Sequence, residues 1–278
     1  MKITDSDFEQ IINSITAYTG IIPRESHKTG IYAFLEKRSQ ELEEKGVTSN
    51  YVEYISKHND EVISIINSST VNETYLFREE KQFMFLRDVV FPELRHALPP
   101  IRIWSAASSS GEEIYSLALL AKACRIPAEY TASDINTDVL QKCKEGIYKK
   151  NSVRTVDGAK FHYLLEPYKQ KDGTFHMPIE ISHFVKTEHI NLSDLAKGII
   201  PENIPKQQHI IFIRNVFIYF SFEMRAKILE VLAQHCLADD GYLFVSMNEV
   251  ASLENSCIPP SLKKRSHDTV FYFQKSKA

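Results

Sequence analysis

The sequence predicts an α/β protein with a largely parallel sheet covered by helices on both faces, preceded by a helical N-terminal region. From residue 101 onward, short apolar runs rich in β-branched and aromatic residues alternate with helical stretches, which is the pattern of βαβ units. Before residue 70, apolar residues recur at intervals of three and four between charged positions, which is the period of amphipathic helices. This change of period separates two parts of the chain.

The N-terminal part is predicted to be a small helical bundle over residues 4–68. Its apolar positions are Phe8, Ile11, Ile12, Ile15, Tyr18, Ile31, Phe34, Leu35, Leu42, Tyr51, Tyr54, Ile55, Val62, Ile63, Ile65 and Ile66. The polar stretch 67–70 marks the domain edge, and a further amphipathic helix over about 79–96 ends at Pro99 and Pro100. We therefore expect a helical domain over 1–70, followed by a linker motif and helix over 71–100.

The C-terminal part is predicted to be one α/β domain over residues 101–278. The expected strands cover 101–106, 128–133, 209–214, 241–247 and 269–274, and the expected helices cover 112–124, 137–146 and 222–237. The last two strands are not separated by a long helix, so we expect an antiparallel end to the sheet. Residues 160–190 break the alternation around a turn at Asp172–Gly173, which predicts a small antiparallel insertion.

Composition and charge exclude several classes of protein. The chain has 278 residues and a formal net charge of −3, which gives no support to bulk electrostatic binding of nucleic acid. No two of its nine glycines lie closer than ten residues apart, so neither of the common glycine-rich phosphate loops is possible and a nicotinamide-dependent oxidoreductase is disfavoured. The four cysteines lack C-x-x-C spacing, and the ten histidines lack the spacing of a metal site. The cysteine usage fits a reducing cytosol, and no apolar run approaches the roughly 18 residues of a membrane helix, so we expect a cytoplasmic protein with no spanning segment.

Acidic residues follow the first strand of the predicted sheet. That strand runs into residues 107–113, where Glu112 and Glu113 open a helix. Two carboxylates there would repel a pyrophosphate but attract an ammonium or sulfonium group. The alternative is ordinary capping, with a serine as the N-cap and both glutamates favoured by the helix dipole.

A second acidic residue closes the next strand. Asp134 lies 23 residues beyond Gly111, where an acidic side chain commonly binds a ribose diol, although it could equally be the N-cap of the following helix. Carboxylates at two neighbouring strand ends, with no phosphate loop, point to S-adenosylmethionine. That cofactor carries a ribose, an ammonium, a carboxylate and a sulfonium, but no phosphate.

The strand predicted over 209–214 closes with Arg214 and Asn215 within an otherwise apolar stretch. Buried arginine and asparagine side chains are costly unless they are paired. The alternative is that Arg214 is the first residue outside the sheet and faces water.

Five motifs in order give the sequence a specific resemblance to a known family. They are Asn72-Glu73-Thr74-Tyr75-Leu76-Phe77-Arg78, residues 103–116 with the sequence IWSAASSSGEEIYS, residues 132–135 with the sequence ASDI, Asn191-Leu192, and residues 214–220 with the sequence RNVFIYF. These motifs resemble those of the chemotaxis receptor methyltransferases of the CheR type. The match runs from about residue 70 to the end of the chain, and the helical N-terminal region matches in kind.

The resemblance implies a Rossmann-like, S-adenosylmethionine-dependent methyltransferase fold and the activity of a protein-glutamate O-methyltransferase. The substrate would be glutamates of the cytoplasmic helical bundle of chemoreceptors, the product of the cofactor would be S-adenosylhomocysteine, and the enzyme would be a monomer recruited to membrane receptor arrays. Transferred residue by residue, the cofactor contacts fall on Asn72, Thr74, Arg78, Glu113, Asp134, Asn191, Leu192, Arg214 and Asn215, with Arg78 and Tyr219 as catalytic residues beside the methyl group. Glu113 would meet the ammonium, Asp134 the ribose, and Asn191 and Leu192 the adenine.

The chemistry of this reaction explains why no catalytic base stands out in the sequence. A glutamate side chain has a pKa of about 4.3 and is already ionised at neutral pH, so only positioning and exclusion of water are required. Arg78 could orient the acceptor carboxylate. The alternative for Arg78 is a surface arginine paired with Glu79 or Glu80.

The sequence departs from the family at three places. The first loop has Ser108-Ser109-Ser110, the segment at the end of the strand predicted over 241–247 has Ser246-Met247-Asn248-Glu249, and the N-terminal domain lacks the paired arginines that relatives present to acidic receptor helices. Candidate substitutes for those arginines are Lys28, Lys37 and Arg38, or the cluster Lys142, Lys144, Lys149, Lys150 and Arg154, for which a solvated helix face is the alternative. Two other functions therefore stay open: methylation of a different substrate, and a non-catalytic relative that binds receptors.

Overall fold

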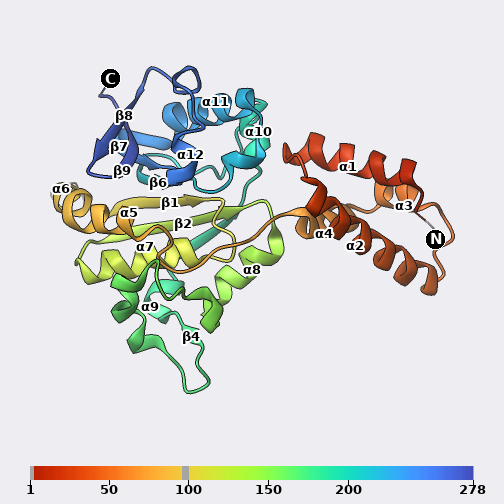
Figure 1. Ribbon diagram of the computed structural model, residues 1–278, viewed down its shortest axis with the longest axis horizontal. Coiled ribbons are helices and arrows are strands. Elements are labelled where there is room, and N and C mark those ends of the chain that lie inside the picture. The colour runs from red at the N-terminus through yellow and green to blue at the C-terminus, as the bar shows by residue number, and fades with distance from the viewer. Residues whose placement is uncertain (1–2, 96–99, 278) are drawn as a thin grey trace.

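The computed structural model describes residues 3–95 and 100–277. In Figure 1 the N-terminal helices form a bundle that projects to one side of an α/β domain, and the two parts are joined by the segment that follows α4. Within the described residues, no helix is both long enough and apolar enough to cross a membrane.

The N-terminal bundle consists of α1 (Asp5–Thr19), α2 (Glu25–Glu44), α3 (Tyr51–Lys57) and α4 (Asn59–Ser69), as the apolar period predicted. The first helix begins with a capping box between Thr4 and Asp7 and ends at Gly20, whose φ of 72° suits a helix C-terminus. The core of the bundle is formed by the buried apolar side chains Ile11, Ile15, Ile31, Leu35 and Ile65. The predicted domain edge at 67–70 coincides with the end of α4.

A buried ion pair ties α2 to α4. Glu61 is fully buried, with a side-chain exposure of 0%, and it accepts hydrogen bonds from Arg38 Nε and Nη2 at 2.9 to 3.0 Å and from the Tyr51 hydroxyl at 2.6 Å. The hydrogen bonds to Glu61 raise the pKa of Arg38 although burial opposes them. Because a buried carboxylate is costly without such partners, this network fixes how the helices pack.

The linker helix lies against the sheet. It is built from α5 (Glu80–Phe85), a π-helical turn η1 (Leu86–Val90) and α6 (Phe91–Leu94), which run on without a break. This agrees with the helix predicted over 79–96, except that its predicted end at 96 and Pro99 lie outside the described residues.

The main sheet has seven strands in the order β5-β2-β1-β6-β7-β9-β8. Their bounds are β1 (Ile101–Ala106), β2 (Ala128–Asp134), β5 (Val185–His189), β6 (Gln208–Phe212), β7 (Leu237–Phe244), β8 (Leu262–His267) and β9 (Val270–Lys275). The first five strands in this order are parallel, whereas β9 runs antiparallel to β7 and to β8. The predicted parallel sheet with an antiparallel end is therefore confirmed.

Helices cover both faces of this sheet (Figure 1). The α5 to α6 helix and α7 (Glu112–Ala123) pack on one face, and α10 (Leu192–Ala196) and α11 (Phe222–Val231), which continues as the π-helical turn η6 (Leu232–Cys236), pack on the other. Along β1, Ile101 and Ile103 enter the first core, and Trp104 and Ala106 enter the second. A strand buried on both faces explains the continuous apolar run at 101–106.

The region 160–190 differs from its predicted structure. A small antiparallel sheet is present, but it pairs β3 (Ile147–Tyr148) with β4 (Phe175–His176). Residues between them form the 3₁₀ helices η2 (Lys150–Ser152), η3 (Ala159–Leu164) and η4 (Glu166–Tyr168), α9 (Ile179–Ser182) follows β4, and Val185–His189 is the parallel edge strand β5 of the main sheet. The predicted turn is present, because Thr174 N donates to Asp172 Oδ1 at 2.9 Å.

The order of the strands creates a ligand-binding edge. From β1 the chain first builds outward through β2 to β5, and then returns to the other side of β1 to build β6 and β7. The chain that leaves the carboxyl end of β1 therefore goes to one half of the sheet, and the chain that leaves the carboxyl end of β6 goes to the other half. Such a switch point is where open α/β sheets bind ligands. The helix α8 (Thr137–Glu145) follows β2, and α12 (Met247–Val250) follows β7, at the same edge.

The buried ion pair in the N-terminal bundle is testable by substitution. Glu61→Ala leaves the Arg38 guanidinium without its main partner, so we expect the free energy of unfolding of the bundle to fall by about 3 kcal/mol. Urea unfolding followed by circular dichroism measures this change. Glu53→Ala, which removes an exposed partner of Lys57, is the matched control and should change stability by less than about 1 kcal/mol. Equal effects of the two substitutions would contradict the proposed importance of burial.

Candidate S-adenosylmethionine site

One cavity lies at the carboxyl edge of the sheet, where the N-terminal bundle meets the α/β domain. It holds about 950 Å³ of empty space, its open mouth included. All ten residues nominated from the sequence line it, namely Asn72, Thr74, Arg78, Glu113, Asp134, Asn191, Leu192, Arg214, Asn215 and Tyr219. Five separate segments of the chain thus converge on one site.

The turn between β1 and α7 forms the floor of the cavity in a strained backbone conformation. Ala107, Ser109 and Gly111 have positive φ angles of 83°, 49° and 93°. A Cβ at Gly111 would lie 2.5 Å from Cys143 Sγ, so glycine is required there. Gly111 itself is the N-cap of α7 and no side chain caps this helix, so the serine capping considered from the sequence is wrong.

The two glutamates that open α7 point to different places. Glu113 lines the cavity, and its Oε1 accepts a hydrogen bond from Ser105 Oγ at 2.6 Å. Glu112 instead accepts from the hydroxyls of Ser110 and Ser152 at 2.6 and 2.9 Å, away from the cavity, and burial raises its pKa. The expectation that both carboxylates face a cationic ligand is therefore wrong for Glu112, because consecutive helical residues point in different directions.

Asp134 holds the turn and still presents acceptor capacity to the cavity. Its Oδ2 accepts from Ser109 N at 2.8 Å and its Oδ1 accepts from Asn136 N at 3.0 Å. Burial raises the pKa of Asp134, and these backbone donors oppose that rise. The N-cap of α8 is Asn136, so the capping role considered for Asp134 is wrong. Each carboxylate oxygen has a further lone pair that can accept a hydroxyl group.

Arg214 is the buried cation at the base of the site, and its side chain is only 1% exposed. Its Nε donates to Glu113 Oε2 at 2.6 Å, and its Nη1 lies 3.6 Å from Glu79 Oε2. Burial by itself lowers the pKa of Arg214, but these two carboxylates outweigh it and raise the pKa above its ordinary value. The alternative in which Arg214 faces water is therefore wrong.

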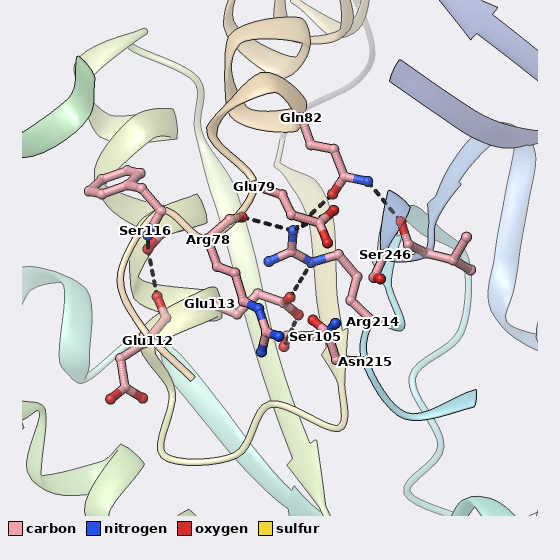
Figure 2. A network of polar contacts seen from close by, with 12 residues as sticks. Arg78, Glu79, Gln82, Ser105, Glu112, Glu113, Ser116, Arg214, Asn215 and Ser246 are labelled. Atoms are coloured by element: carbon pink, nitrogen blue, oxygen red, sulfur yellow. Dashed lines mark hydrogen bonds and ion pairs between the residues drawn. The ribbon is translucent and has the colours of Figure 1, made fainter. Parts of the chain in front are cut away.

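Arg214 also joins the linker to the sheet, as Figure 2 shows. Its Nη1 donates to the backbone oxygen of Arg78 and to Gln82 Oε1, both at 2.9 Å, and Gln82 Nε2 in turn donates to Val245 O at 2.7 Å. Its Nη2 finds no acceptor or carboxylate anywhere in residues 3–95 or 100–277. Two N–H groups of this guanidinium therefore remain available to a ligand in the cavity.

The segment that carries Arg78 is held by its neighbours in an uncommon conformation. Phe77 and Glu79 have positive φ angles of 58° and 61°, which are costly for residues other than glycine. Phe77 N donates to Ser116 Oγ at 2.8 Å, and Glu79 N donates to Asp157 Oδ2 at 2.7 Å. These contacts, together with the bond from Arg214, fix the backbone on both sides of Arg78.

The guanidinium of Arg78 is free of carboxylate partners. Its Nη1 donates to Glu73 O at 2.9 Å, and its terminal carbon lies 5.5 Å from the centroid of the Tyr75 ring. Among the described residues no acidic side chain forms an ion pair with it, so the surface pairing with Glu79 or Glu80 considered from the sequence is wrong. The Arg78 guanidinium can therefore donate hydrogen bonds to a carboxylate from outside the chain.

Glu249 supports the opposite wall from behind. This glutamate is fully buried, and its carboxylate accepts hydrogen bonds from the backbone N–H groups of Asn215 at 2.8 Å, Ile218 at 3.3 Å and Ser246 at 3.1 Å. It thus fixes the turn that carries Asn215 and Tyr219. Burial raises the pKa of Glu249, and the same donors oppose that rise. The sequence retains Glu249 within an otherwise altered motif, but it does not indicate that this side chain supports the turn of Asn215 and Tyr219.

The N-terminal bundle completes the cavity with residues that sequence reasoning missed. Thr19, Ile21 and His27 line it, and Ile22 N donates to Tyr219 O at 3.3 Å. The one signal for this contact in the sequence is the glycine at position 20. A Cβ at Gly20 would lie 2.1 Å from Met224 Cε of α11, so a larger residue would not fit there. Asn191 strengthens this contact, since its Nδ2 donates to Tyr18 O at 2.9 Å.

The candidate cations of the N-terminal domain are not equally available. Arg38 is engaged with Glu61 and Glu41 inside the bundle, so the expectation that it substitutes for the family's receptor-facing arginines is wrong. Lys28 pairs with Glu25, and the largely exposed Lys37 lies 3.8 Å from Glu41.

Comparison with known proteins gives one consistent result. The family model described as "CheR methyltransferase, SAM binding domain" matches residues 72–263. The chain is 32% identical to the chemotaxis protein methyltransferase of Escherichia coli over 90% of this chain and 86% of that protein. It is 31% identical to chemotaxis protein methyltransferase 2 of Pseudomonas aeruginosa, covering 88% and 87%, and 30% identical to the chemotaxis protein methyltransferase of Borreliella burgdorferi, covering 90% and 89%.

The matched region begins at Asn72, includes the linker helix, and contains all ten residues nominated from the sequence. The relatives extend the likeness through the N-terminal bundle, which also lines the cavity. The chain therefore belongs to the CheR family of S-adenosylmethionine-dependent chemotaxis methyltransferases.

Proposed function

We propose that this protein transfers the methyl group of S-adenosylmethionine to glutamate side chains on the cytoplasmic helices of chemoreceptors, with the ten cavity residues as its site. The observation that supports this substrate is the guanidinium of Arg78, which lines the cavity with Tyr219 and has no acidic partner in the part of the chain that the structure describes. A guanidinium without an acidic partner is a recognition group for a carboxylate.

The charged side chains that line the cavity complement the charged groups of the cofactor. Glu113 meets the ammonium group, and Arg214 meets the carboxylate of the methionine portion through its two unused Nη2 N–H groups. Asp134 accepts the ribose hydroxyls with the oxygen lone pairs that Ser109 N and Asn136 N leave open. Asn191 and Leu192 border the adenine, where Asn191 is held by its bonds to Ser193 N and Tyr18 O.

The residues of the chain then have only to position the acceptor. When bound, the cofactor supplies an electrophilic methyl group that leaves its sulfonium sulfur as the new ester C–O bond forms. Arg78 orients the acceptor carboxylate, and Tyr219 closes the wall beside it. The glutamate is ionised at neutral pH, so no general base is needed. Neutralisation of opposite charges is favoured in a site that excludes water.

The name shared by the relatives supports a chemotaxis role. We propose that the protein acts as a monomer in the cytoplasm, is recruited to membrane receptor arrays, and presents the N-terminal domain, over 1–70, to the receptor. The substrate helix then crosses the mouth of the cavity, between this domain and the methyltransferase domain over 101–278.

Asp134→Asn tests the placement of the cofactor. The substitution keeps the size of the side chain but replaces one acceptor oxygen by a donor, so the affinity for S-adenosylhomocysteine should fall at least about tenfold. Titration calorimetry measures the affinity and should give one site per chain for the wild type. The exposed Asp138→Asn on α8 is the matched control. Undiminished affinity in Asp134→Asn would reject this placement.

Arg78→Ala separates catalysis from cofactor binding. If Arg78 orients the acceptor, kcat for methyl transfer to receptor membranes should fall about a hundredfold, while the affinity for S-adenosylhomocysteine changes by less than about threefold. A labelled-methyl transfer assay and calorimetry give the two numbers. Arg87→Ala, which removes a half-buried arginine that is paired with Asp88 and lies outside the cavity, serves as the control. Equal losses in rate and affinity would make Arg78 a binding residue only.

The substrate itself is identified by mass spectrometry. Receptor membranes incubated with the protein and labelled cofactor should carry the label as methyl esters on glutamates of the cytoplasmic helices. Label confined to other proteins or to small molecules would instead support the alternative substrates, and absence of any label would support a non-catalytic relative.

A further inference from the structure

Two guanidinium groups share the ring of Tyr75 beside the cavity. The terminal carbon of Arg78 lies 5.5 Å from the ring centroid, and that of Arg154 lies 5.2 Å from it. Cations within about 6 Å of an aromatic centroid are attracted by the ring electrons. Arg154 therefore extends from the loop after β3 to the same platform as the arginine proposed to orient the acceptor.

The platform is half-buried and held in place. The Tyr75 hydroxyl donates to Asp157 Oδ2 at 2.7 Å, and Asp157 also accepts from the backbone N–H groups of Glu79 and Glu80. Burial and the contact with Asp157 raise the pKa of Tyr75 to about 12, so the phenol stays neutral. Leu76 N donates to Ser152 O at 2.8 Å, which joins the loop of Arg154 to the segment of Arg78. The two arginines are thus carried by one connected unit.

The charge of Arg154 is available to a partner. Its ion pair with Glu73 spans 3.3 Å, and the side chains are 51% and 66% exposed. Exposed pairs of this kind contribute little to stability and exchange readily. Glu73 also lines the cavity, so an incoming carboxylate at the rim would meet Arg154 where Glu73 now does.

The surroundings of Arg154 favour an acidic partner. Lys149 and Lys150 precede it, are exposed, and have no ion pair with any residue that the structure describes. The loop that carries Arg154 is therefore locally positive although the whole chain has a net charge of −3. Such local complementarity selects an acidic ligand surface.

We propose that Arg154, on the Tyr75 platform, binds a second acidic side chain of the substrate helix, one or two turns away from the glutamate that accepts the methyl group. This inference rests on the proposed function, because Arg78 is taken to hold the acceptor. The two guanidinium carbons lie at most about 11 Å apart, since each lies within 5.5 Å of the same centroid. One turn of a helix advances 5.4 Å, so two turns span the largest separation.

The test combines an enzyme substitution with a substrate substitution. The substrates are cytoplasmic receptor fragments that keep one acceptor glutamate, with the acidic residues one and two turns away either retained or replaced by glutamine. With the wild-type enzyme, replacement should lower kcat/KM about threefold to fivefold, as expected for one exposed ion pair. With Arg154→Ala, kcat/KM should already be lowered to that extent, and replacement should have less than about a twofold further effect.

Three controls complete the test. Arg154→Lys keeps the charge but loses the planar stacking on Tyr75, so its kcat/KM should lie between those of the wild type and Arg154→Ala. Arg265→Ala removes an exposed arginine of the edge strand β8 with the same change in net charge, and should behave as the wild type. The affinity of Arg154→Ala for S-adenosylhomocysteine should be unchanged, because Arg154 does not line the cavity.

Independent effects of the two substitutions, or wild-type kcat/KM in Arg154→Ala, would overturn the proposed contact while leaving the proposed methyltransferase function intact. Absence of methyl transfer from the wild type to any fragment, with S-adenosylhomocysteine still bound, would overturn the proposed function and this inference with it.

Discussion

The structure of the site depends on one buried cation. Arg214 follows the central strand β6, and its side chain is almost fully withdrawn from water. A buried guanidinium is stable only when carboxylates and hydrogen-bond acceptors surround it, so its presence dictates where Glu113, Gln82 and the backbone of Arg78 must lie. The sheet, the first helix of the α/β domain and the linker from the N-terminal bundle are thereby joined at one point.

This arrangement also explains the electrostatic character of the cavity. The carboxylates of Glu113 and Asp134 line the cavity together with the buried Arg214, which suits a ligand that carries cationic groups and a carboxylate, while the guanidinium of Arg78, which has no carboxylate partner among the described residues, suits an anionic acceptor. The backbone that surrounds the cavity is strained at Phe77, Ser109 and Asn215, and hydrogen bonds on each segment hold that strain in place.

Much of the fold and of the candidate site was predictable because the relevant signals are local. Strand β1 is buried on both faces and appears in the sequence as a continuous apolar run, whereas the edge strands β5 and β8 are largely polar and were missed. The ten residues nominated from the sequence motifs all line one cavity. Three features could not be predicted from the local sequence because each depends on contacts between segments far apart in the chain. Glu112 points away from the cavity, Arg38 forms an ion pair with Glu61, and Glu249 supports the turn that carries Asn215.

The central claim is that acidic side chains at two neighbouring strand ends, with Arg214 between the halves of the sheet, hold the adenosyl donor. A crystal structure of the protein soaked with S-adenosylhomocysteine tests it most directly. We predict the ribose hydroxyls on Asp134, the amino group on Glu113 and the carboxylate on Nη2 of Arg214. Electron density for the ligand at any other place, or an empty cavity at saturating concentration, would contradict the claim.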